Sequence, residues 1–512
     1  MLAPFLLAVF SVLSLLASNW GQVDAWQAVR RLLPGMLLLA LALLLVIRLL
    51  VRDWRKAALL ASLFLVLFIS YGHIYQALTN VEILGAMIRR HRILAPVFAV
   101  MGILLAWLIW RQKTISRNFT TAVNLAVLVL VLMQVGQIGV LSVRNASASA
   151  EKGQNRLEWT VAPNRGNTPD VYYIILDGHV RQDMLQTEFD LDNSAFIQKL
   201  RNMGFFVADC AMSNYAQTEL SLASSLNYSY LQTLDSTLDP NSNDKSDEWA
   251  LTRESAVLSN FKQLGYTTIT FDTGFNWANL TKADIYFSPA SENQSTIVTP
   301  FESMYLRSTA ALIFLDANTL SGEDLTQRVN APNGEYIQRI RFTLNKLNEI
   351  AAYPSPKFVM AHLVIPHYPF VFNPDGSLQE DVHFYMNAGL PVNGEYETEG
   401  YRNQVQFIDT QIVGILQQIL DKSKTPPIII LQGDHGWGGD SRMTILSAYY
   451  LPGENAVQQL YPDITPVNSF RVVFNQYFGA DLPLLPDESY LSSYDLPFKF
   501  SEVSDPSPLC LN

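Results

Sequence analysis

Two apolar runs in the second half of the chain end in residues that commonly bind metals. The run 171–176 leads into Asp177-Gly178, and the run 428–431 leads into Gly433-Asp434-His435-Gly436. In an open α/β sheet, ligands bind at the carboxyl ends of the strands. Two carboxylates and an imidazole at that edge suit a divalent cation such as Zn²⁺ or Mn²⁺.

A hydroxyl group is available between these two runs. In the segment 214–221, Asn-Tyr-Ala-Gln-Thr-Glu-Leu-Ser, a hydroxyl stands where a helical pattern begins. A metal, a hydroxyl nucleophile and a sheet edge together suggest phosphoryl-type transfer.

Alternating strand and helix signals surround these motifs. Strands are predicted at 171–176, 205–208, 266–271, 358–365 and 428–431, and helices at 193–203, 255–264, 335–352 and 401–420. The strands are continuously apolar, which is typical of strands buried on both faces. The pattern predicts an α/β domain with a mostly parallel sheet covered by helices on both faces.

The first part of the chain differs in composition from the rest and is strongly apolar. Five apolar stretches lie at 2–17, 32–51, 57–78, 93–110 and 121–141, each near the length of about 20 residues that crosses a bilayer. The first stretch lacks a basic segment before it and is followed by further spans, so we interpret it as a retained helix rather than a cleaved signal. The sequence predicts an α-helical membrane domain of about five transmembrane helices.

Charge is segregated between the two parts. Residues 1–145 hold 13 Lys and Arg against 3 Asp and Glu, a net charge of +10, and the rest holds 22 against 43, a net charge of −21. Two predicted loops are basic, one with Arg52, Arg55 and Lys56 and with Arg48 beside it, and the other with Arg111, Lys113 and Arg117. The positive-inside rule then predicts a multi-pass plasma or inner membrane protein with a cytoplasmic N-terminus and an extracytoplasmic catalytic domain. Arg89, Arg90 and Arg92 lie in a loop that this topology places outside the cell, so the charge difference that supports the predicted orientation is modest.

Composition gives four predicted regions. They are a membrane domain at 1–143, a linker at 144–169, a catalytic domain at 170–450 and a C-terminal extension at 451–512 packed on that domain. The acidity of the outer part argues against a nucleic-acid partner, which requires basic patches. Whether Cys210 and Cys510 pair, and the oligomeric state, stay open at this point.

The ordered motifs resemble a known family. The strand ending in Leu176-Asp177-Gly178, the Gln217-Thr218 turn into a helix, the turn His367-Tyr368-Pro369-Phe370 and Gly433-Asp434-His435-Gly436 resemble the alkaline phosphatase superfamily, in its sulfatase-like branch. Five spans before an outer catalytic domain are similar to lipoteichoic acid synthases and related phosphoglycerol and phosphoethanolamine transferases. The resemblance covers about residues 170–450.

Carried over residue by residue, this resemblance implies a site. Asp177, Thr218, Asp434 and His435 would surround one divalent ion, Mn²⁺, Zn²⁺ or Mg²⁺, with Thr218 as the nucleophile. His367 would bind the phosphate or protonate the leaving group. Structural alternatives stay open: Thr218 could be an ordinary helix N-cap, and Asp177 could merely cap a turn.

Further residues near these motifs are candidates for binding substrate. Trp437 and Arg442 follow the second metal motif, and Trp277 follows the predicted strand 266–271. His362 lies inside a predicted strand, and we interpret it as a buried structural histidine. His179 is expected to be exposed rather than a ligand.

The sequence also departs from the family patterns. The segment Cys210-Ala211-Met212-Ser213-Asn214 lacks the Cys/Ser-x-Pro-x-Arg motif of classical sulfatases, which argues against their sulfate ester chemistry. The few histidines of the outer part favour one metal over two. Trp277-Ala278-Asn279 lacks the arginine with which lipoteichoic acid synthases bind phosphoglycerol, and Asp177 replaces their glutamate.

The leading hypothesis is a metal-dependent transferase of the cell envelope. It would move a phospho-alcohol group from a membrane phospholipid to an envelope glycan or lipid, through a covalent phospho-threonine-type intermediate. The first alternative is a sulfatase-like hydrolase, a membrane-anchored phosphodiesterase or phosphatase that uses water as the acceptor. A non-catalytic binding protein is the remaining alternative.

Overall fold

A computed structural model describes most of the chain, which divides into two compact units. The described residues are 2–20, 25–78, 82–83, 86–87, 91–151, 168–289, 300–316, 332–380, 394–453, 456–508 and 510. The first unit comprises Met1–Val143, Gln294–Glu335 and Asn387–Pro391, and the second comprises Arg144–Asn293, Tyr336–Met386 and Val392–Asn512. Arg89 and Arg90, which bear on the predicted membrane orientation, lie outside the described residues.

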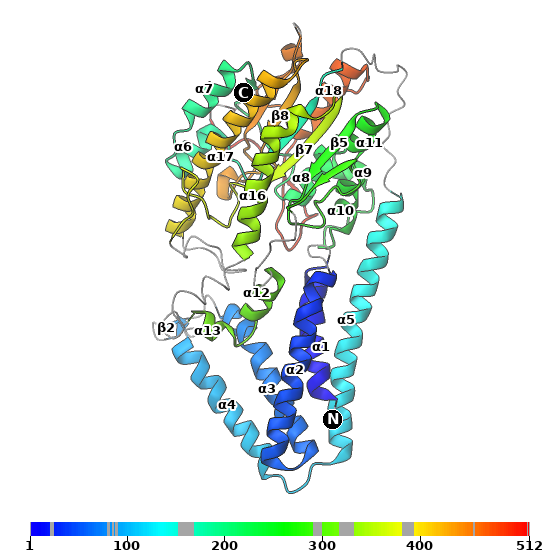
Figure 1. The fold of residues 1–512 in the computed structure, drawn as a ribbon, viewed down its shortest axis with the longest axis vertical. Coiled ribbons are helices and arrows are strands. Elements are labelled where there is room, and N and C mark those ends of the chain that lie inside the picture. The colour runs from blue at the N-terminus through cyan, green and yellow to red at the C-terminus, as the bar shows by residue number, and fades with distance from the viewer. Residues whose placement is uncertain are drawn as a thin grey trace. The chain divides into compact units, whose positions relative to one another are not determined.

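Apolar helices build the first unit (Figure 1). They are α1 (Ala3–Ser18), α2 (Ala25–Val51), α3 (Trp54–Ala77), α4 (His91–Arg111) and α5 (Arg117–Glu151), with the short antiparallel pair β1 (Glu82–Ile83) and β2 (Ala86–Met87) before α4. Among the described residues, four helices are long and apolar enough to cross a membrane. The predicted apolar helical domain is confirmed, with four described helices of membrane-spanning length where the sequence predicted about five. Its first helix, with 16 residues, spans only about 24 Å at 1.5 Å per residue and is shorter than the others.

Burial separates α1 from the outer helices. Ala8 and Val12 of α1 are fully buried, whereas Ile103 of α4 and Met133 of α5 are 68% and 62% exposed. Large apolar side chains that face outward along long helices are typical of a surface covered by lipid. α1 therefore lies inside the bundle, while α4 and α5 present apolar faces to its surroundings.

A segment from much later in the chain also belongs to the first unit. The helices α12 (Pro300–Arg307) and α13 (Leu312–Asp316) follow the first strands of the other unit in sequence. Nε and Nη2 of Arg31 donate to the two carboxylate oxygens of Glu302 at 2.9 and 2.8 Å, and the Tyr305 and Ser11 hydroxyls lie 2.6 Å apart. The sequence analysis included residues 300–316 in the catalytic domain predicted at 170–450. It did not predict that this segment would return to the helical unit.

The second unit is built on a seven-stranded sheet with the order β4-β9-β8-β3-β7-β5-β6. The strands are β3 (Val171–Leu176), β4 (Phe206–Val207), β5 (Thr267–Phe271), β6 (Ile285–Phe287), β7 (Lys357–Leu363), β8 (Ile428–Gln432) and β9 (Ser447–Tyr450). β3 pairs in parallel with both β7 and β8, and β5 pairs in parallel with β6 and β7. Only the edge formed by β9 and β4 is antiparallel within the described sheet. The predicted mostly parallel sheet is confirmed.

Helices cover both faces of this sheet (Figure 1). One face packs against α8 (Thr218–Ser225), α11 (Ala256–Gln263) and α18 (Pro466–Phe478), and the other packs against α7 (Ser194–Asn202), α16 (Pro332–Glu349) and α17 (Gly394–Lys422). Along β3, Tyr173 and Ile175 join the first cluster, while Tyr172 and Ile174 join the second. Because alternate side chains point to opposite faces, a strand buried on both sides must be apolar throughout.

Shorter elements and a C-terminal tail complete the second unit. These are α6 (Gln182–Phe189), α9 (Leu231–Leu234), α10 (Ser246–Arg253), β10 (Tyr490–Leu491) and β11 (Ser501–Glu502), with one-turn 3₁₀ helices at Ile350–Ala352, Gly439–Arg442 and Ala456–Gln459. The tail ends in a disulfide between Cys210 and Cys510, whose Cα atoms lie 5.5 Å apart. The pairing that the sequence left open is therefore made.

A buried ion pair lies at the end of the sheet opposite the metal motifs. The Lys357 ammonium, which is fully buried, bonds to the Asp170 carboxylate. Asp170 also accepts hydrogen bonds from the Lys357 backbone at 3.0 Å and from the Ser355 hydroxyl at 2.9 Å. These bonds join the start of β7 to the residue before β3.

We predict that Asp170→Ala lowers the free energy of unfolding by roughly 3–5 kcal/mol, because it leaves the Lys357 charge buried and unpaired. Glu349→Ala, which breaks the exposed pair with Lys346, should leave the free energy of unfolding almost unchanged, because water screens this pair. Chemical denaturation followed by circular dichroism measures both. Equal losses in the two variants would contradict a special contribution from the buried pair.

Candidate metal centre and nucleophile

Asp177 is held at the carboxyl end of β3 by its backbone. Its N–H donates to the Leu363 carbonyl of β7 at 3.0 Å, and its carbonyl accepts from the His367 N–H at 3.1 Å. The next residue, Gly178, has φ +74°, a left-handed conformation that favours glycine. The chain can therefore turn directly behind the carboxylate.

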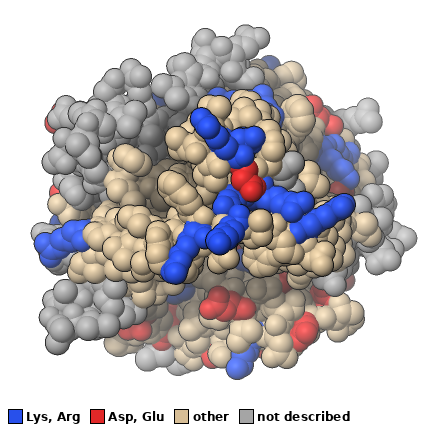
Figure 2. All heavy atoms as spheres, turned by 90° about the horizontal axis from the view of Figure 1, so that it is seen from below, with Lys and Arg blue, Asp and Glu red and all other residues tan. Residues whose placement is uncertain are grey.

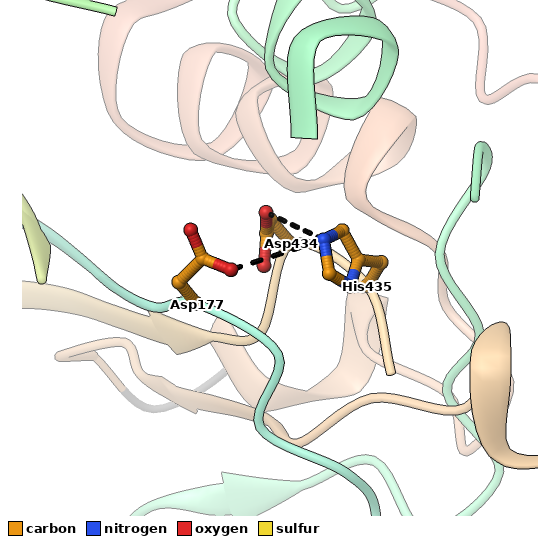
Figure 3. Close-up of side chains that lie close together, drawn as sticks. All are labelled: Asp177, Asp434 and His435. Atoms are coloured by element: carbon orange, nitrogen blue, oxygen red, sulfur yellow. Dashed lines mark ion pairs between the residues drawn. The ribbon is translucent and has the colours of Figure 1, made fainter. Parts of the chain in front are cut away.

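Asp434 and His435 arrive from the neighbouring strand β8. The Gly178 N–H donates to Oδ1 of Asp434 at 3.0 Å, and the Ser221 hydroxyl of α8 donates to the Asp434 carbonyl at 2.7 Å. A Cβ on Gly436 would lie 1.7 Å from the Ser441 carbonyl oxygen, so the turn after His435 requires glycine. Figure 3 shows the three side chains of Asp177, Asp434 and His435 converging on one point.

These three side chains fit a divalent cation. Their ligand atoms all lie within 4.8 Å of one another, and all three residues are buried. Asp177 Oδ1 and Asp434 Oδ2 are buried oxygens without a hydrogen-bond partner. They lie 3.8 and 3.6 Å from His435 Nε2. Two unpaired carboxylate oxygens held this close to an imidazole nitrogen are costly unless a cation joins them.

The tautomer of His435 follows from its other nitrogen. Nδ1 lies 2.6 Å from the Gly436 carbonyl oxygen and must carry the proton to donate to it, which leaves the lone pair on Nε2. Burial and the charge of Arg442 lower the pKa of His435 below its ordinary value, so the ring is neutral at pH 7. His435 is thus prepared to be a ligand.

Thr218 places its hydroxyl against this cluster. It is the first residue of α8, and its Oγ1 lies 3.0 Å from His435 Nε2. The N-cap is Gln217, so the alternative that Thr218 is an ordinary N-cap is wrong. The helix start contributes a partial positive charge beside the hydroxyl. The structure therefore brings together all four residues proposed around the metal.

His362 reaches the site, contrary to our expectation. It is buried, as expected, but its Nε2 donates to Asp177 Oδ2 at 3.1 Å. The parallel register pairs Ile175 with His362. Asp177 comes two residues after Ile175, directly behind the end of β3, and therefore shares a face with His362. His362 is recognised as a neighbour of Asp177 only from the register between β3 and β7. The sequence of either strand alone does not indicate it.

Charges around Asp177 keep it ionised. Burial raises the pKa of its carboxyl, but the charge of His367 and the hydrogen bond from His362 outweigh burial, and the pKa lies well below its usual range. Burial also lowers the pKa of His362, yet its bond to Asp177 outweighs this and raises the pKa. Asp177 can therefore bind a cation without first losing a proton.

His367 and Trp437 stand beside the cluster. The His367 ring lies 6.4 Å from the His435 ring and 5.9 Å from the Trp437 ring. His367 Nδ1 lies 3.1 Å from the Tyr368 carbonyl, so Nε2 is the atom available to a substrate. The Trp437 indole donates to Glu397 at 3.0 Å.

Arg442 forms hydrogen bonds that hold the loop after His435. Its guanidinium donates to the carbonyls of Gly436 and Trp437 at 3.2 and 2.9 Å, and to the Tyr494 hydroxyl at 3.3 Å. Nothing in the sequence pointed to Tyr494, which belongs to the C-terminal tail.

Two other expectations are corrected. Trp277 is only 6% exposed and lies in the hydrophobic cluster on one sheet face, 6.0 Å from the Phe275 ring. The chain after β5 folds back and buries the indole, so its position is that of a packing residue. His179 is fully buried rather than exposed, because its Nε2 bonds to Asp409 at 2.8 Å.

Three solved structures that are similar to this chain are distant from it in sequence. The C-terminal periplasmic domain of EptC from Escherichia coli, in complex with Zn, is 12% identical over 66% of this chain and 93% of that one, with a TM-score of 0.39. The integral membrane lipooligosaccharide phosphoethanolamine transferase A from Neisseria meningitidis is 10% identical over 93% and 94%, with a TM-score of 0.40. BT1596, a 2-O GAG sulfatase, is 11% identical over 62% and 72%, with a TM-score of 0.39. No protein-family model and no curated protein matches the chain.

We predict that His362→Ala weakens the affinity for Zn²⁺ or Mn²⁺ roughly 10- to 100-fold, because Asp177 loses the group that orients it. Asp434→Asn should abolish tight binding. Isothermal titration of metal into the chelator-treated protein measures both. Asp409→Asn, which alters the other buried His–Asp pair, is the matched control and should bind metal normally.

Proposed function

We propose that this protein is a membrane-anchored, metal-dependent transferase that uses Thr218 as its nucleophile. It would take a phospho-alcohol group from a membrane phospholipid and pass it to an envelope glycan or lipid. The observation that carries the proposal is the Thr218 hydroxyl, 3.0 Å from His435 Nε2 and beside two unpaired carboxylate oxygens. A hydroxyl at a helix start, next to a metal-ligand set, is an arrangement suited to phosphoryl transfer.

Each residue has a chemical task in this proposal. Asp177, Asp434 and His435 would hold the cation, which when bound makes the Thr218 hydroxyl more acidic and neutralises charge on the phosphoryl group. Thr218 Oγ1 would lose its proton to solvent and form a bond to phosphorus, while the bond from phosphorus to the lipid alcohol oxygen breaks and that oxygen gains a proton. His367 would bind the phosphate or give the leaving alcohol its proton through Nε2.

The acceptor step reverses the first one. An acceptor hydroxyl bonds to the phosphorus of the phospho-threonine, the bond to Thr218 Oγ1 breaks, and the threonine hydroxyl is restored. If water takes the acceptor's place, the products are those of a phosphodiesterase.

The charges of the helical unit favour an orientation in which the catalytic domain lies outside the cell. The N-terminus lies at the end with the α2–α3 and α4–α5 loops, because the Ala3 N–H donates to Asn124 near the start of α5 at 2.8 Å. Arg55, at the start of α3, also donates to the Ile115 carbonyl in the α4–α5 loop at 3.1 Å. Figure 2 shows Lys and Arg gathered on one face. The basic loops favour a cytoplasmic location for this end.

Mass spectrometry of the protein purified with native lipids tests the nucleophile. We predict a covalent adduct on Thr218 that Thr218→Ala lacks, together with a fall in phosphodiester turnover of at least about 10³-fold in that variant. Thr218→Ser, which keeps a hydroxyl, should retain part of the activity. Full turnover in Thr218→Ala would overturn the proposal.

The acceptor is tested separately with a labelled phospholipid. Transfer of label to an added glycan or lipid supports a transferase. Release of free phospho-alcohol alone, with the acceptor unlabelled, would show a hydrolase with the same nucleophile.

A further inference from the structure

The C-terminal tail contacts both loops that build the site. Residues 492–494 follow β10 and lie outside the stretch 170–450 that carries the family resemblance. Ser493 and Ser492 meet the residue before the nucleophile, and Tyr494 meets the arginine behind the metal ligands. One short segment thus touches the Thr218 side and the His435 side of the same site.

On the nucleophile side, the contact is made through Gln217. This side chain is buried, with an exposed fraction of 1%. Its Nε2 donates to the Ser493 carbonyl at 3.0 Å and the Ser492 hydroxyl at 3.3 Å, and its Oε1 accepts from Lys245 at 3.2 Å. Gln217 is the N-cap residue directly before Thr218, and its backbone carbonyl accepts from the N–H groups of Leu220 and Ser221 at 3.1 and 2.9 Å. Its side chain makes no capping bond to α8 and holds the tail instead.

On the metal side, the contact is made through Arg442. Its guanidinium bonds to the Tyr494 hydroxyl and also to the carbonyls of Gly436 and Trp437, which follow His435 in the chain. The Tyr494 ring also lies 6.0 Å from the Arg442 guanidinium and 5.6 Å from the Lys245 ammonium. A tyrosine ring at these distances attracts both cations.

The tail is itself anchored next to the site. The Tyr490 N–H donates to the Asn214 carbonyl at 2.9 Å, and its ring stacks on Tyr215 with centroids 5.8 Å apart. Further along, Asp505 pairs with Arg181 at 2.6 Å, and Cys510 bonds to Cys210. Residues 492–494 are therefore held at both ends.

We propose that Gln217 and Tyr494 are positioning residues. The tail segment 492–494 bridges the segment 214–221, which carries the nucleophile, and the segment 434–442, which carries two of the metal ligands. The bridge sets the distance between the Thr218 hydroxyl and the metal ligands. This inference rests on the proposed function for its catalytic consequence, since misplacing a nucleophile by about 1 Å can cost a factor of about 100 in rate. The bridge itself is a property of the fold and is testable without turnover.

Hydrogen exchange of the full-length protein tests the bridge. Tyr494 is 64% exposed, so Tyr494→Ala removes little packing. We expect this variant to speed amide exchange in peptides covering both 214–221 and 434–442, with an unchanged melting temperature. Leu491→Ala, which removes a 40% exposed tail side chain three residues away, is the matched control and should leave both peptides unchanged. Unchanged exchange in Tyr494→Ala, or equal changes in Leu491→Ala, would overturn the bridge.

A double-mutant cycle tests the catalytic consequence. We expect Gln217→Leu and Tyr494→Ala each to slow Thr218 adduct formation roughly tenfold or more, with KM and metal affinity little changed. Releasing either end removes the bridge, so the double variant should be close to the slower single variant rather than the product of both effects. Multiplicative effects would show two independent roles and overturn the bridge. A wild-type protein that forms no adduct, while exchange responds as expected, would overturn the proposed function and leave the bridge standing.

Discussion

The parallel pairing of β3 with β7 on one side and with β8 on the other is the constraint on which the site depends. Because all three strands run the same way, their carboxyl ends meet at one edge of the sheet. Asp177 leaves β3 there, Asp434 and His435 leave β8, and His367 follows β7. A register shift of one residue on β7 would turn His362 to the opposite face and separate it from Asp177.

Electrostatic balance explains how two carboxylates can be buried together. Asp177 is supported by His362 and by the charge of His367, and Asp434 accepts the Gly178 N–H. These bonds satisfy one oxygen of each carboxylate and leave the other unpaired. Buried polar atoms are usually paired, so the two unpaired oxygens are an arrangement that a cation would complete.

The helical unit and the α/β unit follow different rules for burial. The sheet is apolar because both of its faces are covered, whereas α4 and α5 are apolar on faces that no protein segment covers in the described structure. In the first case the apolar side chains leave water by packing, and in the second they require lipid. The chain also returns to the helical unit through α12, whose Glu302 bonds to Arg31.

The sequence by itself determined the apolar helices, the class of the α/β domain and the three residues of the candidate metal cluster, Asp177, Asp434 and His435. It could do so because hydropathy, strand and helix periodicity and residues at strand ends are local signals, and they predicted β3, α7, α11, β7 and β8 nearly at their observed bounds. Only the tertiary structure decided what depends on register and distant packing. It brought His362 to Asp177, buried Trp277 and His179, paired Cys210 with Cys510, and carried Tyr494 to Arg442. These contacts join residues that are 52 to 300 positions apart, or depend on which face of a strand is turned inward, and no pattern within a short stretch of chain records them.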